Sequence, residues 1–240
     1  YPTVLRTVAT SGKKTAAVGT ASLLTSVSGK TGACDDYGIL DFECGGGSHK
    51  RCIESSSCNL NFRASVSTET NGLPNSAEVV ERVAEVMEGN ADLIVVHLNN
   101  LNVAGTKLGS FSADSMHYQA QLYMVDAIVG QVMAMVNKRA VERRENWLIM
   151  GVSDHGGHEH ESNTQVGDDD VTTFFTSIVS PHGPLKLNVP VIKTTQMDAA
   201  PTLLKWFGLF TEDAKARMDG RVQSICTTGA EARNCTDADV

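Results

Sequence analysis

The densest group of chemically capable side chains lies in the segment from Ser153 to Glu161, which reads Ser-Asp-His-Gly-Gly-His-Glu-His-Glu. It places three histidines and three carboxylates within eight positions. Carboxylates supply negative charge and imidazole is a ligand suited to zinc, so this pattern predicts a metal site. Its candidate ligands are Asp154, His155, His158 and His160. The alternative is a solvated acidic loop whose exposed histidines chelate divalent ions only weakly.

A second loop, from His97 to Gly109, is also placed where chemistry is expected. It follows the apolar run Leu93 to Val96, and its polar residues include Asn99, Asn100 and Asn102. In open α/β sheets, ligands collect beyond the carboxyl ends of the strands. The loops that follow the apolar runs 93–96 and 147–152 are therefore the places to look for a site.

The elements that would position these loops alternate between helix and strand. Short continuous apolar runs indicate strands buried on both faces, and three-and-four spacing of apolar residues indicates helices. This order predicts an α/β fold with a mostly parallel central sheet sandwiched between helices. Helices are expected at 3–9, 77–87, 112–139 and 197–207, and strands at 16–18, 92–97, 147–152 and 173–179.

Composition excludes two classes of partner. The chain has 240 residues, with 20 Lys and Arg against 28 Asp and Glu, giving a net charge of −8. A phosphate backbone is held by clustered basic residues, so a nucleic-acid binder is not expected. No apolar run approaches the roughly 18 residues that a membrane-spanning helix needs, so no membrane span is expected either.

The six cysteines predict two cross-linked regions. Four lie in a Gly- and Ser-rich segment without hydrophobic periodicity, and two lie near the end of the chain: Cys34, Cys44, Cys52, Cys58, Cys226 and Cys235. Their loose spacings favour disulfides over a zinc knuckle, which remains the alternative. Together with the sequon at Asn234, they favour a glycoprotein of the extracellular space or the secretory lumen. The predicted division is 1–30 (start of the core), 31–62 (cysteine-rich insertion), 63–210 (rest of the core) and 211–240 (tail).

Five motifs occur along the chain in a characteristic order: Tyr1-Pro2-Thr3-Val4-Leu5, Gly12 to Gly19, the His97 to Gly109 loop, Ser153-Asp154-His155-Gly156-Gly157 and Gln196-Met197-Asp198-Ala199-Ala200-Pro201-Thr202. Together they resemble the alkaline phosphatase superfamily, and most closely its type I phosphodiesterase and nucleotide pyrophosphatase branch. The resemblance covers nearly the whole chain outside the cysteine-rich insertion and the tail.

The resemblance implies a two-metal hydrolase in which one metal activates a Thr or Ser nucleophile and the other steadies the phosphoryl oxygens. The family's first loop carries Asp and His four residues apart, and Asn102 and Thr106 occupy those positions here. Asp154 and His155 match the pair assigned to the other metal, and either His158 or His160 matches the last histidine. The family's nucleophile and a further Asp are expected upstream of Tyr1.

These substitutions lead us to expect a catalytically degenerate domain, a pseudoenzyme with a structural or binding role in an assembly. At most one divalent metal, zinc or manganese, would remain at the second loop. A protein partner, or an N-terminal segment, would cover the open part of the sheet. The alternatives are an active metal-dependent phosphoric ester hydrolase whose nucleophile lies outside this chain, with His97 or His117 as unusual ligands, and a simple one-metal binding module.

Overall fold

The computed structural model describes residues 4–20, 62–154, 156–158, 161–163, 174–180, 183–185 and 195–223. The chain forms two compact units, which we describe separately. The first unit comprises Tyr1–Val132 with His158–Glu161, and the second comprises Met133–Gly157 with Ser162–Val240. All six cysteines and the sequon at Asn234 lie outside the described residues, so the predicted insertion, its cross-links and the glycosylation stay predictions.

A parallel sheet of three strands is the centre of the first unit. Strand β1 (Thr15–Thr20) lies between β2 (Phe62–Val66) and β3 (Leu93–Val96), and both neighbours run parallel to it. Ala16, Ala17 and Val18 are all at most 1% exposed, although successive side chains of a strand point to opposite faces. Both faces of β1 are therefore covered, which confirms the predicted α/β class with a small parallel sheet.

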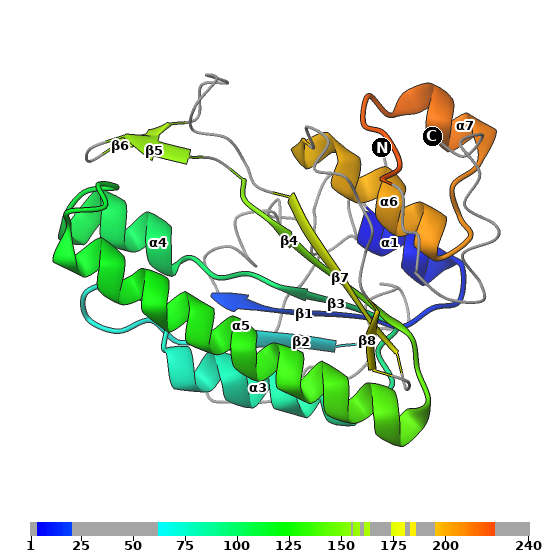
Figure 1. Ribbon diagram of the computed structural model, residues 1–240, viewed down its shortest axis with the longest axis horizontal. Helices are drawn as coiled ribbons and strands as arrows, with labels where there is room; N and C mark the ends of the chain where they lie inside the picture. Colours follow the sequence, from blue (N-terminus) through cyan, green and yellow to red (C-terminus); the bar gives the residue numbers. More distant parts are fainter. Residues whose placement is uncertain are drawn as a thin grey trace, which may run out of the picture. The chain divides into compact units, whose positions relative to one another are not determined.

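Helix α3 (Ser76–Glu88) packs against β1 and β2 (Figure 1), and helix α1 (Val4–Thr10) packs against β1. The side chain of Asn75 caps α3 by accepting a hydrogen bond from the Glu78 backbone N–H at 3.2 Å. Gly89 ends the helix. The apolar spacing of this helix predicts a stripe at Val79, Val80, Val83, Val86 and Met87, and all of these except the half-buried Val80 are buried.

The loop after β3 folds into two short helical segments, which the sequence did not predict. They are α4 (Asn100–Val103) and the π-helical turn η1 (Ala104–Leu108). The long helix α5 (Met116–Arg143) follows, as predicted. Its apolar spacing predicts a stripe at Leu122, Val125, Val129, Val132 and Val136. Val136 is buried, but Leu122 and Val129 are 50% and 40% exposed, and Ile128 and Ala140 are buried as well.

The second unit contains an antiparallel sheet in the order β4-β7-β8. Its strands are β4 (Trp147–Val152), β7 (Phe174–Ser180) and β8 (Gly183–Leu185). The prediction of a mostly parallel sheet is wrong for these strands. Hydrophobicity indicates that a strand is buried but carries no information on the direction of its neighbour, and mixed sheets are common. The two-stranded sheet of β5 (Gly156–His158) and β6 (Glu161–Asn163) was not predicted.

Arg139 connects the end of α5 to the start of β4. Its guanidinium donates to the Glu145 carboxylate at 2.9 and 3.2 Å and lies 4.9 Å from the centre of the Trp147 ring. The Trp147 indole N–H donates to the same carboxylate at 3.0 Å. The Arg139 side chain is 7% exposed and the Glu145 side chain 32%, so this partly buried ion pair holds the turn between helix and strand.

Three helical segments complete the second unit: η2 (Gln196–Asp198), α6 (Ala199–Trp206) and α7 (Glu212–Arg217). Pro201 lies near the start of α6, as predicted, where its missing N–H costs no helical hydrogen bond. No helix in the described part of the chain is long and apolar enough to cross a membrane.

Candidate functional site

The first candidate loop begins at the carboxyl end of the parallel sheet. The His97 backbone N–H still donates to the Val18 carbonyl at 2.9 Å, and the chain then turns into α4. His97 is half-buried, and His117 is exposed near the start of α5. His117 therefore lies on the surface, as expected. Across the described ranges, no group of three or more His, Cys, Asp or Glu side chains could hold a metal ion.

Asn100 is the buried polar residue of this loop, with 0% of its surface exposed. Its amide nitrogen donates to the Gln121 side-chain oxygen at 2.9 Å and to the Ser76 hydroxyl at 3.4 Å. Its side-chain oxygen has no hydrogen-bond partner among the described residues. Asn100 thus connects α4 to the first turns of α3 and α5.

Asn102 and Thr106, which the resemblance aligns with the family's Asp and His, contact each other. The Thr106 hydroxyl donates to the Asn102 backbone carbonyl at 2.7 Å, the usual back-bond of a threonine to the preceding helical turn. The Thr106 hydroxyl group is therefore directed at the helix backbone. Gly105, between them, lies so close to the Phe111 ring that a Cβ would approach it to 2.5 Å. The turn is therefore closely packed at Gly105.

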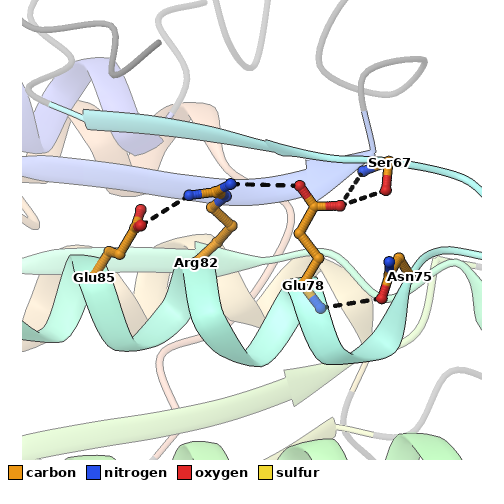
Figure 2. Close-up of polar contacts among 5 residues, drawn as sticks. All are labelled: Ser67, Asn75, Glu78, Arg82 and Glu85. Carbon is orange, nitrogen blue, oxygen red and sulfur yellow. Dashed lines mark hydrogen bonds and ion pairs between the residues drawn. The ribbon is translucent and has the colours of Figure 1, made fainter. Parts of the chain in front are cut away.

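A second polar network fixes the loop that follows β2, next to the start of α3 (Figure 2). The Glu78 carboxylate accepts hydrogen bonds from both the backbone N–H (2.9 Å) and the hydroxyl of Ser67. Arg82 lies 3.6 Å from Glu78 and 2.8 Å from Glu85. Burial raises the pKa of the Glu78 carboxyl, but the hydrogen bonds from Ser67 and the charge of Arg82 outweigh it and lower the pKa. This contact could not be predicted from local sequence patterns, because the fold brings Ser67 and Glu78 together from positions 11 residues apart.

The second candidate loop follows β4 in the second unit. Asp154 is exposed two residues after the strand ends. His158 is the last residue of β5, and His155 and His160 lie outside the described residues. Asp154 is therefore the one predicted ligand whose side chain is described, and the assembly of the set stays a prediction.

Gln196 holds the backbone on both sides of Asp154. Its side-chain amide donates to the Ser153 carbonyl at 2.9 Å and to the Asp154 carbonyl. Two residues later, the Asp198 carboxylate accepts from the backbone N–H of Thr195 at 2.9 Å and of Arg221 at 2.8 Å. The sequence identified Gln196 and Asp198 as parts of a motif but did not assign them these roles.

Comparison with protein families gives one decisive match. The family model described as type I phosphodiesterase / nucleotide pyrophosphatase matches residues 2–204. The chain belongs to this family. The resemblance to the phosphodiesterase branch of the alkaline phosphatase superfamily is thereby confirmed. Comparison with curated proteins finds no match.

Members of the phosphodiesterase family usually depend on metal, so we tested whether the first loop fits one. Residues 97–109 contain no carboxylate. The amide nitrogen of Asn100 and the hydroxyl hydrogen of Thr106 are engaged in hydrogen bonds, and the oxygens that these two side chains could offer a cation are neutral. Neutral oxygens leave the charge of a divalent cation uncompensated, so this donor set does not fit the family's metal. At the second loop, the exposed Asp154 carboxylate can supply one such ligand.

Proposed function

We propose that this phosphodiesterase-family domain is catalytically degenerate and has a structural or binding role. The observation that carries the proposal is the neutral pair Asn102 and Thr106 at the positions where the family carries Asp and His. The Thr106 hydroxyl donates to the Asn102 carbonyl at 2.7 Å, so it completes the helical turn.

Electrostatics explains why this pair matters. Two divalent cations close together carry four positive charges, and anionic first-shell ligands are what holds such charge in place. An amide and a hydroxyl leave the charge uncompensated. Without that metal, a two-metal hydrolase lacks the group that steadies the phosphoryl oxygens.

An active metal-dependent phosphoric ester hydrolase is the second candidate function. It is favoured by the family match over residues 2–204 and by the exposed carboxylate of Asp154 after β4. In this case the nucleophile and a further carboxylate would come from residues outside the chain. One divalent ion, zinc or manganese, bound by Asp154, His155 and either His158 or His160 is compatible with either function.

Restoring the missing ligands tests the proposal. The double variant Asn102→Asp with Thr106→His should bind one more manganese ion per chain than the native protein, measured by equilibrium dialysis and elemental analysis. The matched control is Asn137→Asp with Val141→His, which creates the same four-residue spacing on exposed positions of α5. If the two double variants bind equally, or if the native protein already binds two metals tightly, the degenerate assignment is wrong.

The role in an extracellular or luminal assembly is also a proposal, and it is supported by the cysteine pattern and the sequon. Peptide maps of the natural protein under reducing and non-reducing conditions test it. Cross-linked peptides containing Cys34 to Cys58 would support it. Six free thiols would contradict it, because structural disulfides form in oxidising compartments.

A further inference from the structure

Gln196 makes a contact that neither the family nor the sequence assigns. Its side-chain NH₂ group donates to two successive backbone carbonyls, those of Ser153 and Asp154. These carbonyls belong to the peptide units on either side of the Asp154 α-carbon. Fixing both units restricts the backbone dihedrals of Asp154 and therefore the direction in which its side chain leaves the chain.

The base from which Gln196 reaches this loop is itself rigidly held. The Asp198 carboxylate accepts from the Thr195 and Arg221 backbone N–H groups and from the Gln223 side chain at 2.8 Å, and Asp198 is 4% exposed. The Thr202 hydroxyl accepts from the Gln223 backbone N–H at 2.9 Å. A buried carboxylate with three donors fixes η2 between the loop and residues 221–223.

We infer that Gln196 is a positioning residue, which orients Asp154 through its backbone while Asp198 anchors Gln196. An amide is suited to this task because one NH₂ group offers two donors, so it can satisfy two carbonyls at once. The importance of this orientation for metal binding rests on the proposed assignment of Asp154 as a metal ligand. The restraint on the loop holds whether the domain is active or degenerate.

Substitutions at Gln196 separate this role from ordinary packing. Gln196→Met removes both donors, and Gln196→Glu keeps the length and polarity but faces the two carbonyls with a carboxylate that has no donor. Because Gln196 is exposed, both variants should fold with the native melting temperature. The control is Met197→Ala, since Met197 is 54% exposed on the neighbouring position.

The readout is the NMR order parameter of the Ser153 and Asp154 backbone amides. In the native chain and in Met197→Ala we expect values of about 0.85, and in both Gln196 variants a fall to about 0.6. Native-like order parameters in Gln196→Met and Gln196→Glu would overturn the inference. Detection of turnover would refute the degenerate function but leave this result unchanged, so the two failures are distinguishable.

Discussion

The network around Glu78 makes a quantitative prediction about the first unit. Glu78→Gln keeps the size of the side chain but removes its charge. In the native chain, this carboxylate accepts two hydrogen bonds from Ser67 and lies beside Arg82 (Figure 2). The substitution therefore weakens the connection between the end of β2 and the first turn of α3.

The magnitude follows from the number and type of contacts. A hydrogen bond to a charged group contributes about 1.5–3 kcal/mol, and the variant's amide oxygen can still accept one weaker bond. The Glu78 side chain is 11% exposed, and its ion pair with Arg82, one helical turn away, adds about 0.3–0.5 kcal/mol. We expect the free energy of unfolding to fall by about 2 kcal/mol at pH 7.

The effect must also depend on pH. The pKa of Glu78 is lowered in the folded state from its ordinary value of 4.5. The unfolded state therefore binds the proton more readily, so the stabilisation is fully present above pH 4.5 and is lost as the pH falls through the folded-state pKa. The difference between native protein and Glu78→Gln should shrink over that acid range.

Urea denaturation followed by far-UV circular dichroism gives the free energies, and amide exchange of peptides from residues 62–88 assigns the change to this region. Glu81→Gln is the control, because Glu81 is an exposed carboxylate on the same helix. Its effect should stay within about 0.5 kcal/mol. Equal effects of the two substitutions, or a Glu78→Gln effect that persists unchanged at low pH, would refute the reasoning.

Two further predictions concern the second unit. Asp198→Asn turns an amide toward three donors and should lower the free energy of unfolding, measured by urea denaturation, by about 2–3 kcal/mol. The control Asp213→Asn breaks an exposed ion pair with Arg217 and should change the free energy of unfolding by less than about 1 kcal/mol. Equal losses would contradict the anchoring role of Asp198. Gly220→Ala should lower the melting temperature by several degrees, because a Cβ would overlap the Met197 carbonyl. Gly130→Ala should raise the melting temperature, since Gly130 lies inside α5 with open space around it. A native melting temperature for Gly220→Ala would contradict this packing.

Local sequence signals predicted the elements whose causes are local. The valine spacing within residues 77–87 predicted α3 at nearly its observed position, and the apolar run Leu93 to Val96 predicted β3. The buried face of α5 was predicted only in part, because Leu122 and Val129 satisfy helical spacing as well as the buried Ile128 does. Several stripes of a long apolar-rich helix have the same period, and tertiary packing selects among them.

Long-range features of the site could not be predicted in the same way. The chemistry of the Asn102 and Thr106 positions was visible in the sequence because it depends on residue type alone. The hydrogen bonds from Gln196 to residues more than forty positions earlier depend on how η2 lies against the end of β4. The spacing of apolar residues in the sequence does not indicate such a contact. The antiparallel pairing of β4 with β7 was missed for the same reason.

The central claim, that this phosphodiesterase-family domain is catalytically degenerate, is tested most directly by one measurement. The full-length protein is saturated with zinc or manganese, its bound metal is counted, and hydrolysis of a chromogenic phosphodiester is followed in the same sample. We predict at most one bound metal per chain and no turnover above the metal-free buffer control. Two metals per chain together with multiple turnovers would contradict the claim.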